Sequence, residues 1–328
     1  MGELICLGIE STAHTFGVGI VTESGRILAS EKDIYKPPLG SGIIPEEAAR
    51  HHKQLKEKLF EAALDKACIS ADDIGVIVYA CGAGLPPCLR VGADFAIELS
   101  KKLSKPLVPV CHQIGHIEIG RLTTEAKDPI IVYLSGGNTQ IIGYNEGRYR
   151  IFGETEDIPI GNALDVLARE MGLPMPGGSE IEKLAADGNY VKLPYVVKGM
   201  DLSFSGILTF ASNKLKAGIS KKDLAFSMQE TCFAMLTEVS ERALAHTNKK
   251  EVLLVGGVAL NKRLQEMLRA MCEDRGAKFF AVPALYGMDN GVMIAWAGLF
   301  AYKSECKPDF TDKIRPKWRT DEVEVKWF

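Results

Sequence analysis

The chain has 328 residues, of which 46% are hydrophobic and 25% are charged, proportions that are typical of a soluble globular protein. Its formal net charge is −3, so the overall composition does not indicate a nucleic-acid binder, and any such binding needs local basic patches or partner surfaces. No apolar run reaches the length of a membrane span, and the short apolar run at 5–9 is followed by Glu10, so we expect neither a signal peptide nor a membrane partner.

The first part of the chain opens with two apolar stretches, 4–12 and 16–21, separated by a short polar turn, and a further strand begins at Ile27. The pattern of apolar residues then predicts an alternation of helices and strands. We expect a helix at 45–66, a strand at 74–79, a loop at 81–87, a helix at 91–103, a strand at 107–110 and a helix at 112–123.

The second part begins in the same way, with a strand at 130–134, a turn of small polar residues at 135–139, a strand at 140–144 and another at 150–152. Helices and strands alternate again after this opening. We expect helices at 162–171, 179–187, 204–216, 221–246, 261–275 and 290–303, and strands at 251–255 and 279–282. The tail at 313–328 has no periodic pattern, but it carries a basic cluster that suits phosphate or a plain solvated surface: Lys313, Arg315, Lys317 and Arg319.

The repeated opening indicates an internal duplication, and a duplication of this length predicts two similar lobes. We place the boundary just before Ile130, so that the lobes span 1–128 and 129–328. Strands that alternate with helices favour mainly parallel sheets covered by helices, and a cleft between two such lobes is a usual place for a ligand. The eight cysteines are scattered and form no C-x-x-C pair, as expected of reduced thiols in a cytoplasmic protein.

The turn between the two strands after Ile130 reads S-G-G-N-T, from Ser135 to Thr139. Its two glycines allow a sharp turn and bring backbone N–H groups close to a ligand, while the neighbouring side chains add donors without bulk. Such a turn can hold a phosphate, although an ordinary hairpin loop has the same composition.

His112 and His116 have the spacing of two metal ligands, because residues i and i+4 share one face of a helix. The alternative is a pair of partly exposed helix histidines. A metal needs further ligands, and Asp289 is a candidate, although an Asp before a helix is more often its N-cap. Tyr133 offers a phenol oxygen beside the polar turn. The pattern is not H-E-x-x-H, because Gln113 follows His112, which disfavours peptide hydrolysis.

Three further features suit a nucleotide. The segment 256–261 follows a strand with two glycines and opens a helix, so it admits a ligand closely and presents helix N–H groups, or it is simply a tight turn. Asp165 and Glu182 lie near glycine-rich turns, where a carboxylate can accept hydrogen bonds from ribose hydroxyls. Taken singly, each acid is more typical of an ordinary helix surface.

Together these motifs resemble the universal tRNA threonylcarbamoyladenosine transferase family, called TsaD or Gcp in bacteria, and more closely its archaeal and eukaryotic branch, the catalytic subunit of the KEOPS complex. The similarity covers nearly the whole chain in family order. It rests on segments that include GIESTAHTFGVGIV, HQIGHIEIGR, VYLSGGNTQI, GNALDVLARE, PGGSEIEKLA, VGGVALNKRL and MDNGVMIAWAG. The chain departs from the family at Ala83, where proline is usual, and at Cys111 and Gln113 beside His112.

The resemblance implies a duplicated α/β fold of the actin-like type, shared with acetate kinase, sugar kinases and heat-shock ATPases, with nucleotide and metal in the cleft between lobes. It implies a divalent metal, iron or zinc, bound by His112, His116 and Asp289, with Tyr133 nearby or coordinating. It also implies that the ATP or AMP moiety of an adenylate lies against Tyr133, Leu134, Ser135, Gly136, Gly137, Asn138, Asp165, Gly178, Glu182 and Asn261.

The implied reaction transfers a threonylcarbamoyl group from threonylcarbamoyl-adenylate to the exocyclic amine of the adenosine 3′ of the anticodon, in tRNAs that read codons beginning with A, and releases AMP. The implied partners are tRNA and KEOPS-type subunits, including a small protein kinase. No residue is assigned as general base. The alternatives are a nucleotide-dependent actin-like scaffold, a small-molecule kinase on the same fold and, suggested only by H-x-x-x-H, a metallopeptidase.

Overall fold

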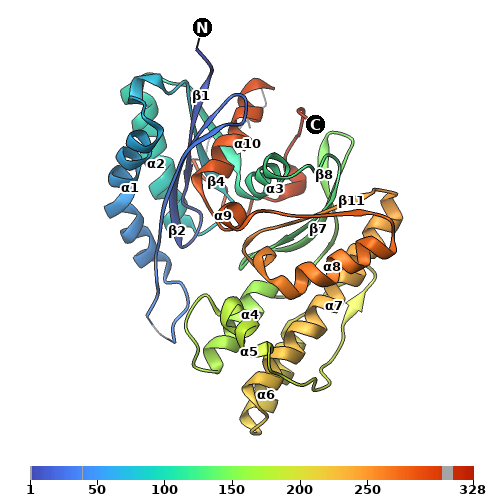
Figure 1. The fold of residues 1–328 in the computed structure, drawn as a ribbon. Helices are drawn as coiled ribbons and strands as arrows, with labels where there is room; N and C mark the ends of the chain where they lie inside the picture. Colours follow the sequence, from blue (N-terminus) through green and yellow to red (C-terminus); the bar gives the residue numbers. More distant parts are fainter. Residues whose placement is uncertain (1, 39, 305–312) are drawn as a thin grey trace.

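The computed structural model describes residues 2–38, 40–304 and 313–328. The fold contains two five-stranded sheets, and helices alternate with the later strands of each sheet along the chain (Figure 1). The first sheet has the order β3-β2-β1-β4-β5 and consists of β1 (Ile5–Glu10), β2 (Thr15–Thr22), β3 (Ile27–Ile34), β4 (Val76–Gly82) and β5 (Leu107–Cys111). The second has the order β12-β11-β6-β7-β8 and consists of β6 (Ile130–Leu134), β7 (Thr139–Asn145), β8 (Arg148–Glu154), β11 (Glu251–Val255) and β12 (Lys278–Ala281).

The two sheets have the same topology, as the repeated opening predicts. In each, the first three strands form antiparallel hairpins, the fourth strand pairs in parallel with the first, and the fifth pairs in parallel with the fourth. The expectation of mainly parallel sheets is therefore wrong, because half of the strand pairings in each sheet are antiparallel. The cause is the short turn after each opening strand, which returns the chain directly beside itself, whereas a parallel pairing needs a crossover helix.

The predicted helices all occur in the predicted order, with small shifts at their ends, and one short helix, α9, was not predicted. They are α1 (Pro45–Ala67), α2 (Pro86–Leu103), α3 (His112–Thr123), α4 (Ile160–Glu170), α5 (Gly177–Ala185), α6 (Ser205–Lys216), α7 (Lys221–Thr247), α8 (Lys262–Asp274), α9 (Ala284–Gly287) and α10 (Gly291–Lys303). The largest difference is at α2, which begins at Pro86 inside the segment expected to be a loop. Proline suits the first turn of a helix because its missing N–H has no partner there anyway.

Helix α10 returns from the second part of the chain to the first sheet and lies across β1 and β2 (Figure 1). Glycines make this close packing possible. A Cβ atom added at Gly8 would lie 2.2 Å from the backbone nitrogen of Ala295, and one added at Gly19 would lie 2.1 Å from that of Val292. The start of α10, which follows Asp289, is therefore fixed directly against the opening hairpin of the chain.

Helix α3 lies between the two sheets and contacts α10 on one side and β11 on the other. Residues 112–120 are all buried. Gly115 faces Ile294 and Met293 of α10, and Gly120 faces Val255 and Leu253 of β11. Two small residues one and two turns into α3 thus let it pack tightly against both halves of the molecule.

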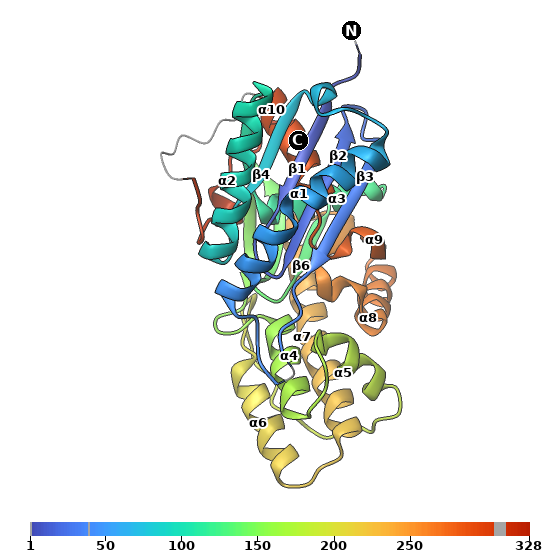
Figure 2. The same ribbon diagram turned by 90° about the vertical axis from the view of Figure 1, so that its left-hand side faces the viewer.

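Helices α4, α5, α6 and α7 extend from the second sheet at the end farthest from the N-terminus (Figure 2). The short strands β9 (Val197–Lys198) and β10 (Asp201–Leu202) pair with each other in this region, and Gly257–Leu260 forms one turn of 3-10 helix. Short 3-10 turns also occur at Ala71–Asp73 and Thr320–Glu322. Within the described residues, no helix is both long and apolar enough to cross a membrane.

All the described cysteines are unpaired, and every one except Cys68 is buried. The eighth cysteine, Cys306, lies outside the described residues. The buried thiols are therefore small core residues, as the sequence predicts for several of the cysteines.

Candidate metal and nucleotide site

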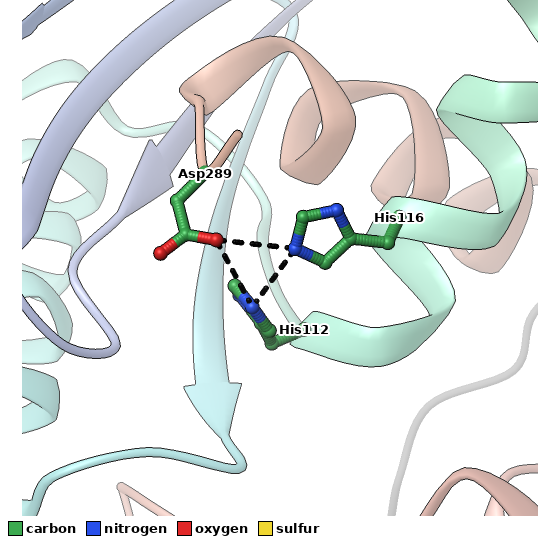
Figure 3. A group of neighbouring side chains, drawn as sticks. All are labelled: His112, His116 and Asp289. Carbon is green, nitrogen blue, oxygen red and sulfur yellow. Dashed lines mark hydrogen bonds and ion pairs between the residues drawn. The ribbon is translucent and has the colours of Figure 1, made fainter. Parts of the chain in front are cut away.

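His112, His116 and Asp289 point toward one another (Figure 3). Nε2 of His116 lies 3.2 Å from Nε2 of His112 and 3.1 Å from Oδ1 of Asp289. Nε2 of His112 lies 3.5 Å from the same Asp289 oxygen. The two histidines come from successive turns of α3, and Asp289 comes from the segment between α9 and α10. The structure thus brings together three residues that the sequence separates widely.

Asp289 is free to face the histidines because its neighbour caps the helix. The side chain of Asn290 is the N-cap of α10 and accepts a hydrogen bond of 3.0 Å from the backbone N–H of Met293. The interpretation of Asp289 as an N-cap is therefore wrong. Asn290 also donates to the carbonyl of Met288 over 2.8 Å, which holds the backbone on both sides of Asp289.

The three facing atoms have the spacing of ligands around one ion. Ligands at about 2.1 Å from a tetrahedral zinc lie about 3.4 Å apart, and the three distances in the structure are 3.1, 3.2 and 3.5 Å. Two imidazole nitrogens and one carboxylate oxygen suit zinc, iron and several other divalent ions. His116 is 1% and His112 is 7% exposed, so both imidazoles are shielded from solvent. The residues present therefore fit the metal that the family resemblance implies.

Tyr133 lies beside this cluster, at the carboxyl end of β6. Its ring centroid is 5.2 Å from that of His116. Its hydroxyl is buried and has no hydrogen-bond partner among the described residues, and burial raises its pKa above the ordinary range. A buried polar atom without a partner is costly unless a ligand satisfies it. The Tyr133 hydroxyl is thus available either to a metal or to a substrate bound next to it.

The electrostatics of the cluster set its two histidines apart. Burial alone would lower the pKa of His112, but the negative charges of Glu10 and Asp289 outweigh it and raise the pKa to about 9. For His116, burial wins and the pKa is lowered. The pKa of Asp289 is held below its ordinary range, because the two nearby imidazoles outweigh the opposing effect of burial. A negative oxygen therefore faces the two rings at neutral pH.

The turn at 135–138 has an exposed backbone and a defined shape. Ser135 accepts backbone N–H hydrogen bonds from Gly137 and Asn138 through its side chain, at 3.3 and 3.0 Å. Gly136 and Gly137 are exposed, and nothing lies within 4 Å of a Cβ atom added at either position. This open, glycine-containing turn leaves room for a ligand to approach its backbone.

The start of α4 and the segment after β11 approach this turn so closely that each has a glycine at the point of contact. A Cβ atom added at Gly161, at the start of α4, would lie 2.5 Å from the carbonyl oxygen of Ser135. One added at Gly256 would lie 2.2 Å from the carbonyl oxygen of Leu134, and Gly256 also has a φ of +94°. The start of α4 and the segment after β11 therefore converge on the turn that follows β6.

The remaining predicted nucleotide residues connect α4, α5 and α8. Asp165 accepts a hydrogen bond of 2.8 Å from the backbone N–H of Gly177, beside Gly178 at the start of α5. Glu182 accepts one of 2.7 Å from the backbone N–H of Lys262. Asn261 is the N-cap of α8. Each side chain thus has a structural partner in the protein, and its contact with a nucleotide remains a prediction.

Glu10 and Thr12 contact the side of the His112 ring that faces away from His116 and Asp289. The sequence patterns do not single out either residue. Glu10 is fully buried, and its Oε2 lies 2.9 Å from Nδ1 of His112. One signal was available in the sequence, since a lone carboxylate at the end of an apolar strand is rarely buried without a partner.

The basic cluster of the tail is partly neutralised in the structure. Lys313 forms an ion pair of 2.8 Å with Asp94, and Arg319 forms one of 2.9 Å with Glu154. The guanidinium of Arg315 lies over the ring of Trp318, 5.3 Å from its centroid. The tail is therefore packed on the molecule, and it is not a loose basic arm.

The sequence model of the family described as tRNA N6-adenosine threonylcarbamoyltransferase (TsaD) matches residues 25–296. The protein of that name from Thermofilum pendens is 51% identical over 330 residues, which cover 100% of this chain and 98% of the relative. The one from Thermococcus kodakarensis is 53% identical, with 99% and 100% covered. A probable bifunctional tRNA threonylcarbamoyladenosine biosynthesis protein from Methanocaldococcus jannaschii is 52% identical over 99% of this chain but only 60% of its own length.

Among solved structures, HypF of T. kodakarensis matches with a TM-score of 0.66 and 15% identity, covering 93% of this chain and 48% of that one. The activator of the 2-hydroxyisocaproyl-CoA dehydratase from Clostridium difficile matches with a TM-score of 0.55 and 13% identity, covering 95% and 99%. At such identities the likeness concerns the fold, which is of the actin-like ATPase type. The identities near 50% over the full chain carry the family assignment: this chain belongs to the tRNA N6-adenosine threonylcarbamoyltransferase family.

Proposed function

We propose that this protein transfers the threonylcarbamoyl group from threonylcarbamoyl-adenylate to N6 of the adenosine 3′ of the anticodon, in tRNAs that read codons beginning with A. The amine nitrogen forms a bond to the carbamoyl carbon, the bond from that carbon to the phosphate oxygen breaks, the amine loses a proton, and AMP leaves. The observation that carries the proposal is the convergence of His112, His116 and Asp289 in a chain about half identical to named transferases over its full length.

His112, His116 and Asp289 would hold one divalent metal, iron or zinc, with Tyr133 beside them. A bound metal would supply Lewis-acid polarisation and charge stabilisation to the reacting group. The chain's own side chains contribute orientation, because α3 and the segment before α10 fix the three ligand atoms 3.1 to 3.5 Å apart. They also exclude water, since both imidazoles are buried.

The adenylate would lie along the surface that runs from Tyr133 and Leu134 through the turn at 135–138 to Asp165, Gly178, Glu182 and Asn261. The exposed backbone of Gly136 and Gly137 would face the phosphate, as the backbone of glycine-containing turns does in other anion sites. Gly256 and Gly161 support this placement, because they bring α4 and the segment after β11 against the same turn.

The tRNA would need surfaces in addition to this chain. The net charge is −3, and two residues of the basic tail are already paired with acids, so strong independent tRNA binding at physiological salt is not expected. KEOPS-type subunits, including a small protein kinase, are the proposed partners. The bifunctional name and extra length of the M. jannaschii relative support an additional protein module. A cytoplasmic location belongs to the same proposal.

The direct experiment is a transfer assay. The metal-loaded protein, its KEOPS-type partners, threonylcarbamoyl-adenylate and an unmodified tRNA that reads A-starting codons are mixed, and the digested tRNA is examined for threonylcarbamoyladenosine. We expect product from the wild type and a loss of about 100-fold or more in His112→Ala. His246→Ala is the matched control, because His246 lies in the last turn of α7 and should leave the rate unchanged.

The other outcomes identify the alternatives. If His112→Ala forms product at the wild-type rate, the protein catalyses the transfer but the cluster of His112, His116 and Asp289 takes no part in it. No product from any form, with partners shown to be active, would favour an actin-like scaffold. Peptide hydrolysis is disfavoured further by Gln113, whose side chain accepts from the Cys111 thiol at 2.8 Å and donates to the carbonyl of Trp318 at 3.3 Å, so it supplies no base.

A further inference from the structure

Glu10 occupies a closed, fully hydrogen-bonded position behind His112. It ends β1 and is 0% exposed. Its Oε1 accepts from the backbone N–H of Thr12 at 2.7 Å and from the hydroxyl of the same residue. Its Oε2 lies 2.9 Å from Nδ1 of His112. The turn that follows β1 therefore folds around the carboxylate and aims its second oxygen at α3.

These contacts specify where the imidazole of His112 carries its proton. A carboxylate only accepts hydrogen bonds, so Nδ1 of His112 must be the protonated nitrogen. Nε2, the nitrogen that faces His116 and Asp289, is then the one whose lone pair a metal can take. The hydroxyl of Thr12 lies 3.3 Å from the same Nδ1 and is compatible with this tautomer, because it already donates to Glu10.

His116 has no such support. Its Nε2 faces the cluster, but its Nδ1 is buried and has no hydrogen-bond partner among the described residues. The two histidines of the cluster are therefore not equivalent. The ring of His112 is held from behind by a buried carboxylate, whereas the ring of His116 has no polar partner on the side away from the cluster. Carboxylates behind metal-ligating histidines fix ring orientation and raise ligand basicity.

We propose that Glu10, held by Thr12, is the positioning residue of the metal centre, and that it fixes His112 with Nδ1 protonated and Nε2 directed at the metal. This inference rests on the metal centre of the proposed function. It adds an unequal division of labour between the two histidines, in which His112 is the anchoring ligand. Glu10 acts through His112 and touches neither metal nor substrate.

The experiment compares wild type with Glu10→Gln. The glutamine keeps the volume but can satisfy the backbone N–H of Thr12 only by turning its NH₂ group toward His112. That group pairs with a bare Nδ1, which moves the proton to Nε2 and blocks it as a ligand. We expect the Zn²⁺ dissociation constant, measured by chelator competition without any substrate, to rise about 10- to 100-fold. In ¹⁵N-histidine NMR of the zinc-loaded protein, the hydrogen-bonded Nδ1 proton of His112 should be lost.

Glu118→Gln is the matched control. Glu118 lies on α3 with His112 and is 1% exposed, but it accepts hydrogen bonds from Tyr149 and Trp327. Its substitution should lower the free energy of unfolding without changing the Zn²⁺ affinity or the His112 signal. Wild-type affinity in Glu10→Gln, or an equal loss in Glu118→Gln, would overturn the proposal. Because no transfer is measured, these results are independent of the proposed reaction.

Thr12→Val provides a second variant in case Glu10→Gln does not fold. It removes the hydroxyl that holds Glu10 while keeping the shape of the side chain and the backbone N–H bond. If Thr12 holds Glu10 in place, Thr12→Val should bind Zn²⁺ several-fold more weakly, while the NMR signal of the His112 Nδ1 proton stays unchanged. An affinity equal to that of the wild type would contradict this role of Thr12.

Discussion

At the scale of single residues, the site depends on neighbours that take over competing tasks. Asn290 caps α10 and so leaves Asp289 free for the histidines. Glu10 occupies Nδ1 of His112 and so directs Nε2 to the cluster. Asn290 thus satisfies the N–H group at the start of α10, which Asp289 would otherwise cap, and Glu10 satisfies the N–H group on the far side of the His112 ring.

Outside the site, His52 makes the stability of the fold depend on pH. It is fully buried in α1, and its Nε2 lies 3.0 Å from the carbonyl of Ala13. Burial is the main reason that its pKa falls from 6.5 to about 4. Because the folded-state pKa is the lower one, the unfolded chain takes up the proton first as pH falls. Stability from this group is complete above pH 6.5 and is lost between pH 6.5 and 4.

The expected loss across this window is about 3 kcal/mol in the free energy of unfolding. Urea unfolding at several pH values measures it, with His52→Gln as the comparison. The variant should be less stable than the wild type at pH 7, and the difference should shrink toward pH 4. A constant difference at every pH would show that protonation of His52 is not coupled to folding.

The sequence predicted part of the site at this scale and missed part. The spacing of His112 and His116 on a helix was sufficient to place both side chains on one face. Asp289 was recognised as a candidate ligand, but sequence alone could not separate it from a helix cap, because Asp and Asn both cap helices and stand side by side here. Glu10 was missed because its partner lies on another element, and burial of a charge depends on tertiary contacts.

At the scale of elements, tight packing through glycine and capping by single acids fix the helices around the site. Gly8 and Gly19 let α10 lie on the first sheet, and Gly161 and Gly256 close the turn after β6. The sequence located these elements well, because their apolar periods are clear. It placed the start of α2 too late, because the two prolines at 86–87 read as a loop although they suit a first helical turn.

The start of α6 is held by the carboxylate of Asp157. Asp157 accepts hydrogen bonds at both oxygens, among them from the backbone N–H groups of Phe204 at 2.9 Å and Ser205 at 3.1 Å. Partial burial opposes ionisation, but the hydrogen bonds outweigh it and hold the pKa of Asp157 below its ordinary range. Asp157→Asn should lower the free energy of unfolding at pH 7 by about 1 kcal/mol, a modest value because the side chain is exposed.

The sign with pH follows from the lowered pKa. Stability from Asp157 is present above the unfolded-state pKa of about 4 and is lost as pH falls further. Thermal unfolding of wild type and Asp157→Asn at pH 7 and pH 3.5 measures the effect, with the exposed Asp274→Asn as control. A difference between wild type and Asp157→Asn that grows at pH 3.5 would contradict the assignment.

At the scale of the whole molecule, two sheets of the same topology are joined by segments that return from the end of the chain. Helix α10 covers the first sheet, and the tail crosses both halves. The backbone N–H of Arg315 donates to Cys81 of β4, Arg319 pairs with Glu154 of β8, and Trp327 donates to Glu118 of α3. The lobes predicted at 1–128 and 129–328 remain a proposal.

The duplication was visible in the sequence because both openings share an apolar–polar–apolar plan. The path of the tail was not visible, since 313–328 has no period and its contacts are scattered side-chain and backbone pairs. The two sheets are mixed because each opens with antiparallel hairpins. Local pattern therefore predicted the repeated unit, whereas the long-range contacts that join the two units required the structure.

If His112, His116 and Asp289 hold a metal that acts in the reaction, transfer must depend on that metal. The wild-type protein is freed of metal with a chelator, combined with its partners, threonylcarbamoyl-adenylate and unmodified tRNA, and assayed before and after addition of one equivalent of Zn²⁺ or Fe²⁺. Metal-free protein should form threonylcarbamoyladenosine about 100-fold or more slowly, one of the ions should restore the rate, and Asp289→Asn should not be restored. Full transfer by the metal-free protein would contradict this expectation.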